Sequence, residues 1–331
     1  MSLLENQLSR YGAITAALPF TPGKIFFVVK SSESYYADFS FIFPPDSAGQ
    51  VRVFSDVKSA YDATVSGRND VIIIDGNATF ALTEMLTVSK SRVHFYGLDH
   101  FTGAGRPYGC STKISLTATT GATNIATIKN TGVRNSFHNI KFLNASTVTE
   151  GIYCVAEGGE YAFYENCEIY KSTDLDVTGA AELVLNGDSA YFKNCTIGSL
   201  ADARSGAVIR PNVLLTKEVV GSGLVTRDAT FKDCNFWIQS TDTANRFVYG
   251  ANATDVERLL KFDNCDFICN GASTAIPAQN IAFGATLTVG AVLVKGCSSL
   301  LASTAMSTTT GVFVDGPVPA AATTGISVQA S

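Results

Sequence analysis

A six-residue pattern that returns along the second half of the chain most constrains how it can fold. The pattern is an apolar residue, any residue, then Asn, Asp or Gly, then Cys or Ile, any residue, and a final residue that is mostly apolar. It occurs at Phe137–Phe142, Tyr164–Ile169, Phe192–Ile197, Phe231–Phe236, Phe262–Phe267 and, more weakly, Val294–Ser299. Successive occurrences are spaced 27, 28, 39, 31 and 32 residues apart.

This repeat predicts a solenoid whose coils stack in register. Parallel strands lie about 4.8 Å apart, so each residue lies above its counterpart in the next coil, and inward positions must stay small or apolar. The fourth position of the pattern therefore predicts a buried core stack, made of Ile140, Cys167, Cys195, Cys234, Cys265 and Cys297. Asn, Asp and Gly tolerate the left-handed backbone of a sharp corner. The third position predicts a corner ladder, made of Asn139, Asn166, Asn194, Asp233 and Asn264.

A second short apolar strand accompanies these segments, as in Ile152–Val155, Leu183–Gly187 and Val312–Gly316. Together the two strand types predict an all-β chain, a right-handed parallel β-helix of about nine coils. Insertions are expected to leave this solenoid from one corner, where they do not disturb the core. A β-sandwich is the alternative, but it does not explain why an Asn-Cys corner returns every 27 to 39 residues.

The solenoid is expected to span residues 71–316, with an N-terminal cap at 23–70. Val57 opens an i, i+3, i+4, i+7 pattern that predicts a short capping helix, and Ser55 or Asp56 can cap its start. Such a helix would cover the open end of the apolar stack, where unpaired strand edges invite aggregation.

Residues 1–22 and 317–331 do not fit the repeat, and we expect them to be extended terminal arms. Their apolar side chains are candidates for contacts with partner chains. These candidate residues are Leu3, Leu4, Leu8, Ile14, Leu18, Ile326 and Val328.

Charge and hydropathy exclude several classes of partner. The formal net charge is −5 and the basic residues are scattered, so a nucleic-acid partner is not expected. No run of about twenty apolar residues occurs, so no membrane span is expected. The first residues lack the basic and apolar regions of a signal peptide, which favours synthesis and folding in a cytoplasm.

The eight cysteines do not have the spacing of a metal site. Zinc sites use paired ligands, and Cys265 with Cys269 is the nearest pair, with no second pair to face it. Free cysteine is among the most buried residue types, so we interpret the repeated cysteines as core residues. No metal, cofactor or disulfide is expected.

Candidate catalytic residues are few. The three histidines are His94, His100 and His138, and their scatter does not suggest a Ser-His-Asp arrangement. Parallel β-helix lyases and hydrolases use clustered carboxylates, with Arg or Ca²⁺ in the lyases. The matching candidates here are Asp174, Asp176, Arg204 and Arg210, with Asp188 and Asp202 nearby in the sequence. Because Asp174 and Asp176 lie in what reads as an exposed connection, we expect that the protein is not an enzyme.

Three segments near the N-terminus carry a family resemblance. Gly23–Val29, Val51–Ala60 and Arg68–Gly76 resemble the opening of pectate-lyase-like β-helix proteins of tailed bacteriophages, in which a strand, a short helix and an Asp-Val-Ile strand lead into the coils. The resemblance implies a structural protein of the virion, often associated with the head.

The expected function is therefore capsid decoration or cementing. Such a protein would be a homotrimer on the capsid surface and would bind the major capsid protein and other virion proteins. The alternative is a tailspike-like protein that binds or cleaves host surface polysaccharide. Aromatics and carboxylates grouped on one face of the solenoid would favour the alternative. A host-derived extracellular lyase is disfavoured because no signal peptide is recognisable.

Overall fold

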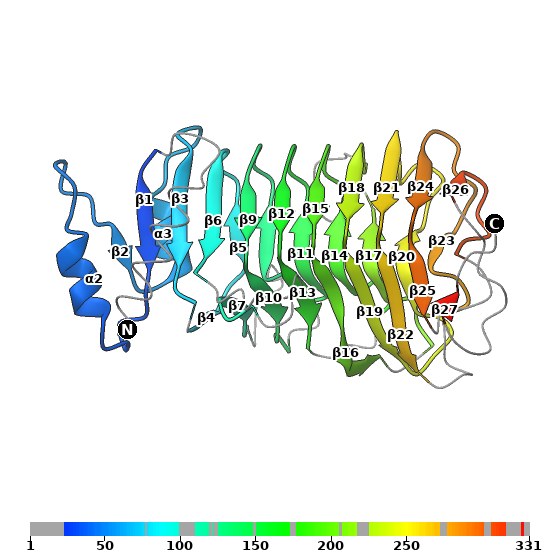
Figure 1. Cartoon of the computed structure of the whole chain (residues 1–331), viewed down its shortest axis with the longest axis horizontal. Coiled ribbons are helices and arrows are strands. Elements are labelled where there is room, and N and C mark those ends of the chain that lie inside the picture. Colours follow the sequence, from blue (N-terminus) through cyan, green and yellow to red (C-terminus); the bar gives the residue numbers. More distant parts are fainter. Residues whose placement is uncertain are drawn as a thin grey trace.

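The chain is an elongated stack of parallel strands, wound into a right-handed parallel β-helix (Figure 1). The computed structural model describes residues 23–76, 78–98, 110–118, 121, 125–147, 150–172, 177–204, 207–216, 225–271, 277–300, 306–315 and 326–327. Strands from successive coils lie side by side along the long axis of the molecule. This arrangement confirms the predicted fold class.

Three sheets form the walls of the solenoid. Sheet A contains, in spatial order, β2 Val53–Phe54, β1 Ile25–Val28, β3 Asp70–Ile74, β6 Val93–Gly97, β9 Ser136–His138, β12 Phe163–Glu165, β15 Tyr191–Lys193, β18 Ala229–Lys232, β21 Leu259–Asp263, β24 Ala291–Lys295 and β26 Val312–Asp315. Sheet B contains β4 Thr79–Leu82, β7 Lys113–Leu116, β10 Lys141–Asn144, β13 Glu168–Lys171, β16 Thr196–Arg204, β19 Asn235–Ser240, β22 Asp266–Gly271, β25 Ser298–Leu300 and β27 Ile326–Ser327, which is antiparallel to β25. Sheet C contains β5 Leu86–Val88, β8 Ile128–Asn130, β11 Tyr153–Glu157, β14 Ala181–Leu185, β17 Pro211–Leu215, β20 Arg246–Gly250 and β23 Ile281–Phe283.

Each coil passes from sheet A to sheet B to sheet C and then returns to sheet A. In the described residues, the run from β3 to β26 supplies nine successive strands of sheet A, in agreement with about nine coils. One strand assignment was wrong. Val312–Asp315 was aligned with the strands that form sheet C, but β26 pairs with β24 in sheet A. The apolar pattern of a strand does not say to which wall it belongs.

Stacked aromatic rings fill the interior behind sheet A. Neighbouring ring centroids are 4.6 to 5.1 Å apart along the ladder Phe95, Phe137, Tyr164, Phe192, Phe231 and Phe262. This spacing matches the rise of one coil. Beside the ladder, the core stack from Ile140 to Cys265 is at most 1% exposed, and Cys297 at its end is half-buried. All eight cysteines are free thiols.

The corner between sheets A and B is short and repeats with little change from β9 onwards. Its ladder residues, Asn139, Asn166, Asn194, Asp233 and Asn264, have φ values of 51° to 57°. The backbone N–H of each donates to a carbonyl of the next coil, so the backbone pairing continues through the turn. Side chains add a second set of bonds: Asn166 Nδ2 donates to Asn139 Oδ1 over 3.0 Å, and Asn194 Nδ2 donates to Asn166 Oδ1 over 2.6 Å.

The other two corners both vary in length, so the prediction of insertions at one corner was wrong. Between sheets C and A the chain runs from Leu185 to Tyr191 in one coil but from Leu215 to Ala229 in the next. Between sheets B and C it runs from Asn144 to Tyr153 and from Arg204 to Pro211. Both connections still place residues in the core, such as Ala190 between sheets C and A and Ala118 between sheets B and C.

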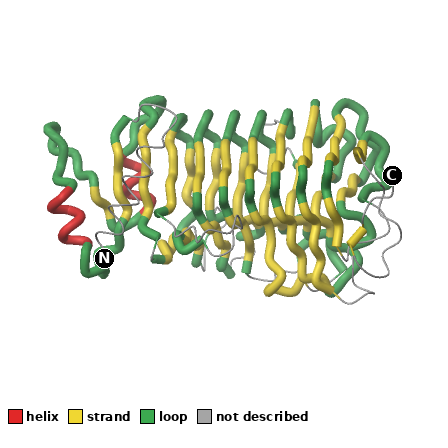
Figure 2. The backbone as a smooth tube through the Cα atoms, viewed as in Figure 1, coloured by secondary structure: helices red, strands yellow, loops and turns green. Residues whose placement is uncertain are grey.

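The two helices of the described residues lie at the N-terminal end of the stack (Figure 2). Helix α3, Val57–Ala63, starts at Asp56, whose side chain accepts a hydrogen bond from the Ser59 N–H over 2.8 Å. Its buried face packs on the solenoid core, where the Tyr61 ring stacks on Phe95. Helix α2, Tyr36–Ile42, buries Phe39 against Phe27 of sheet A.

Most of the two expected arms lies outside the described residues. Leu3, Leu4, Leu8, Ile14, Leu18 and Val328 belong to this part of the chain. Among the arm candidates, the described residues include Ile326, whose backbone forms part of β27. Neither of the two described helices is long and apolar enough to cross a membrane.

Candidate functional site

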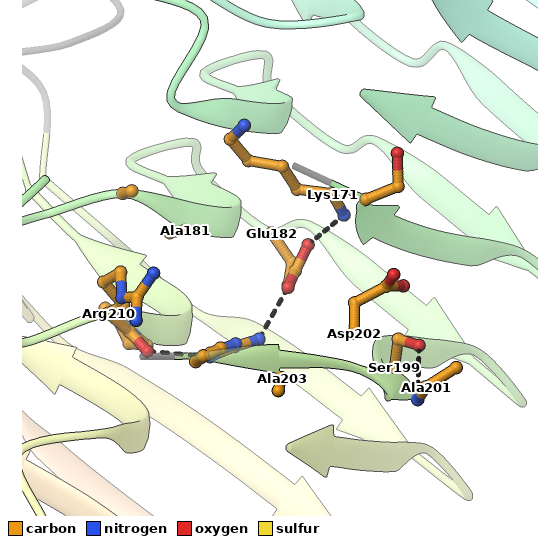
Figure 3. Close-up of a pocket in the computed structure, with 12 residues that line it drawn as sticks. Lys171, Ala181, Glu182, Ser199, Ala201, Asp202, Ala203 and Arg210 are labelled. Atoms are coloured by element: carbon orange, nitrogen blue, oxygen red, sulfur yellow. Dashed lines mark hydrogen bonds and ion pairs between the residues drawn. The ribbon is translucent and has the colours of Figure 1, made fainter. Parts of the chain in front are cut away.

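A polar cavity of about 230 Å³ opens at the corner between sheets B and C, in the coils that contain β13 to β17 (Figure 3). Its wall combines the end of β13, the start of β14, the outer half of β16 and the start of β17. The lining residues are Lys171, Ser172, Ala180, Ala181, Glu182, Ser199, Ala201, Asp202, Ala203, Arg204, Arg210 and Pro211.

A bulge in β16 shapes one side of the cavity. The pairing of β16 with β19 jumps from Ser199 to Ala203, so the residues between them leave the ladder and place Asp202 at the cavity wall. Bulges of this kind are common beside functional sites because they redirect side chains. Gly198, with φ of +97°, permits the bend just before the bulge.

A buried ion pair forms the floor of the cavity. Arg204 Nη2 donates to Glu182 Oε1 over 2.6 Å, and both side chains are at most 10% exposed. The other Glu182 oxygen accepts a hydrogen bond from the backbone N–H of Lys171, as the dashed lines in Figure 3 show. Arg204 Nη1 donates to the Arg210 carbonyl over 2.7 Å. These bonds hold the Arg204 and Glu182 side chains in place, which pre-organises the site.

The cavity carries more positive than negative groups, in a chain whose net charge is −5. Lys171, Arg204 and Arg210 line it together with Glu182 and Asp202. Burial lowers the pKa of Lys171 to about 8 and also lowers the pKa of Arg210. Burial raises the pKa of Glu182, against the opposing effect of Arg204. An anion in the cavity would therefore stabilise its desolvated cations.

The structure brings together part of the predicted catalytic set. Arg204 and Arg210 line the cavity together with Asp202. Asp174 and Asp176 lie outside the described residues. Asp188 is not part of this site, because it lies between sheets C and A, 3.6 Å from Arg227 and from Arg258. In the described part of the chain, no three His, Cys, Asp or Glu side chains form a group that could hold a metal ion.

A second polar cluster lies on the outer face of sheet A, and sequence reasoning missed it. Ser136 and His138 are two residues apart on β9, and β12 places Glu165 directly beside His138. Ser136 Oγ lies 3.0 Å from His138 Nε2, and His138 Nδ1 lies 3.3 Å from Glu165 Oε2. The scatter of the three histidines in the sequence did not suggest this arrangement. The alignment of the repeats could have found it, because Phe137 and Tyr164 occupy the same repeat position.

Aromatic rings continue this outer face in both directions. The His138 ring stacks on Tyr96 with centroids 4.2 Å apart, and Phe163 stacks on Tyr191 at 5.8 Å. Phe163 and Tyr191 are half-buried. They occupy the position of Ser136 on the next two strands of sheet A, β12 and β15. The face thus combines aromatic rings with charged side chains.

Comparison with known proteins identifies the fold but not a family. No family model matches the chain, and no curated protein matches it. Among solved structures, the pectin methylesterase of Aspergillus niger is 14% identical with a TM-score of 0.55, over 90% of this chain and 87% of that one. A pectin methylesterase mutant in complex with a hexasaccharide is 13% identical with a TM-score of 0.52, over 89% of this chain and 82% of that one. A Geobacillus virus E2 protein, ORF18, is 12% identical over 78% of this chain and 56% of that one, with a TM-score of 0.36, which is too low to establish a shared fold.

These comparisons contradict the prediction that the chain is not an enzyme. The structures that it resembles over most of their length are carbohydrate esterases. At 13 to 14% identity the likeness establishes the fold alone. The chain is therefore a right-handed parallel β-helix similar to that of pectin methylesterases.

Proposed function

We propose that this chain is a tailspike-like protein of a tailed bacteriophage that binds an acidic polysaccharide of the host surface through the cavity at Lys171, Arg204 and Arg210. The observation that supports this proposal is a pre-formed, partly desolvated cavity in which basic residues outnumber acidic ones. The outer face of sheet A adds the combination of aromatic rings and carboxylates that favours a glycan-related role over decoration.

The size and chemistry of the cavity suit one acidic sugar unit. Its volume of about 230 Å³ is below the range of a drug-sized pocket, so it would hold one charged residue of a longer chain. A uronic acid carboxylate would bind the guanidinium of Arg210 and the ammonium of Lys171, as charge-assisted hydrogen bonds. Asp202 at the wall would accept hydrogen bonds from sugar hydroxyls.

Titration calorimetry with a galacturonate hexamer tests the proposal, with a neutral glucose hexamer as the reference ligand. We expect binding of the acidic hexamer alone, weakened at least tenfold by Arg210→Gln and by Lys171→Met. Arg227→Gln is the matched control, because Arg227 forms its ion pairs at another corner. Equal binding of both hexamers, or full affinity in the cavity variants, would refute the proposal.

Capsid decoration is the second candidate, and one observation favours it. Phe41 is 87% exposed and Ile42 is 40% exposed on helix α2, and such apolar surface suits a protein partner. In this role a homotrimer on the capsid surface would contact the major capsid protein and other virion proteins. Cryo-electron microscopy of purified particles separates the two roles: many copies on the head favour decoration, and a few copies at the tail tip favour glycan binding.

A further inference from the structure

The cluster on the outer face of sheet A has the connectivity of a nucleophile, a base and an orienting acid. Ser136 Oγ contacts His138 Nε2 at 3.0 Å, and the opposite ring nitrogen contacts Glu165 at 3.3 Å. Each contact joins the atoms that acyl transfer requires: hydroxyl to one imidazole nitrogen, and carboxylate to the other. We infer that Ser136, His138 and Glu165 form the catalytic triad of an ester hydrolase.

A fourth group sets the direction of the hydrogen bonds. His94 Nδ1 lies 2.8 Å from Ser136 Oγ. Burial lowers the pKa of His94 to about 4, so His94 is neutral at pH 7. With its proton on Nδ1, His94 donates to Ser136, which leaves the serine O–H to donate to His138 Nε2. His138 then carries its own proton on Nδ1 and donates it to Glu165. One set of tautomers thus accommodates the contacts of Ser136 with His94 and His138 and the contact of His138 with Glu165.

The acid of the triad stays charged. Hydrogen bonds from His138 and from Lys193, whose Nζ lies 2.7 Å from Glu165 Oε1, lower the pKa of Glu165 to about 2. A charged Glu165 fixes the His138 tautomer and stabilises the imidazolium that forms during reaction. The stacked Tyr96 ring holds the plane of the imidazole. Glu165 and Tyr96 are positioning residues, because they act through His138.

The reaction balances without any co-reactant except water. His138 Nε2 takes the Ser136 proton while Ser136 Oγ bonds to the ester carbonyl carbon. The bond from that carbon to the alcohol oxygen then breaks, and the alcohol leaves with the proton from His138. Water next gives a proton to His138 as its oxygen bonds to the acyl carbon. Ser136 leaves with that proton, and a carboxylic acid is released.

The substrate class follows from what borders the serine. Phe163 and Tyr191 follow Ser136 in register on the next two coils, with their rings stacked at 5.8 Å. Such rings bind the apolar face of a sugar or a short acyl chain. Ser136 is 7% exposed and Phe163 is half-buried, so the geometry fits a small acyl ester that reaches Ser136 from a sugar ring over Phe163. This activity goes beyond glycan binding in the cavity and does not depend on it.

A fluorophosphonate probe with mass spectrometry tests the nucleophile in the unaltered protein. We expect covalent labelling of Ser136 and hydrolysis of p-nitrophenyl acetate above the rate with buffer alone. Ser136→Ala should abolish labelling and lower the hydrolysis rate at least a hundredfold. Thr230→Val is the control, because Thr230 lies on the same outer face three coils further along, and this variant should leave both unchanged. Unlabelled Ser136 in folded wild-type protein would overturn the inference.

The role of Glu165 is tested by kcat and KM measured separately, because a purely structural role would not lower kcat alone. We expect Glu165→Gln to lower kcat at least tenfold with KM unchanged, and Glu165→Asp to restore most of kcat. Unchanged kcat in Glu165→Gln, or no recovery in Glu165→Asp, would overturn its place in the triad. Galacturonate binding by Ser136→Ala separates the two proposals: retained binding with lost hydrolysis shows two independent sites.

Discussion

Replacing Asn166 by alanine tests the left-handed corner on which the solenoid depends. Asn166 has φ of 55° and exchanges side-chain hydrogen bonds with Asn139 and Asn194. Losing two partly buried bonds costs about 2 kcal/mol. Holding alanine in the left-handed region costs about 1 kcal/mol more. We therefore predict that Asn166→Ala lowers the free energy of unfolding by about 3 kcal/mol.

Glycine at the same position separates the two contributions. Asn166→Gly loses the same side-chain bonds but tolerates the positive φ, so we predict a loss of about 2 kcal/mol. The assay is guanidinium unfolding followed by far-ultraviolet circular dichroism. The exposed Lys232→Ala is the control and should change stability by less than about 0.5 kcal/mol. Alanine as stable as glycine at position 166 would refute the left-handed corner.

Three further predictions follow from the core, the outer face and the bulge. Phe192→Ala removes a fully buried ring of the aromatic ladder and should lower the free energy of unfolding by about 4 kcal/mol. Tyr191 is half-buried on the outer face, so Tyr191→Ala should lower it clearly less in the same unfolding assay. His94 has a folded pKa of about 4, below the unfolded value of 6.5, so the unfolded state binds its proton first and stability falls as the pH drops from about 6.5 to about 4. That loss is at most about 3 kcal/mol, and His94→Gln should remove it from unfolding curves measured at pH 7 and pH 4.5. Gly198→Ala would place a Cβ 2.0 Å from the Trp237 carbonyl, so both melting temperature and galacturonate affinity should fall together.

Repetition explains what the sequence made predictable. Some residue types return at the same position of successive coils, as in the corner ladder with Asn166 and the core stack with Cys195. Stacking gives all residues at such a position the same surroundings, so the repeated residue type indicates whether the position is a corner or is buried. The capping helix at Val57–Ala63 was predictable for a different reason. Its spacing and its N-cap are local features that need no knowledge of the register.

Features that repeat in the structure without a repeating residue type were not predictable. A second column of left-handed residues precedes the sheet A strands and includes Arg134, Tyr161 and Ser189, with φ of 56° to 58°. None of these residue types favours that backbone, which is held because each N–H donates to a carbonyl of the next coil. Tertiary hydrogen bonds, rather than local preference, determine this corner.

The sequence indicated part of the cavity, through Asp202, Arg204 and Arg210, and did not indicate the cluster at Ser136. The cavity depends on the β16 bulge, and the pattern between Ser199 and Ala203 does not show how many residues leave the ladder. The triad depends on register, because His138 and Glu165 are distant in sequence but adjacent across β9 and β12. A search for motifs along the chain cannot find a site whose members are brought together by stacking.

The most direct test of acidic glycan binding is a crystal structure of the protein soaked with the galacturonate hexamer. The proposal predicts one sugar in the cavity, with its carboxylate within hydrogen-bond distance of Arg210 or Lys171 and a hydroxyl against Asp202. A hexamer bound elsewhere on the solenoid, or an empty cavity at saturating ligand, would contradict it.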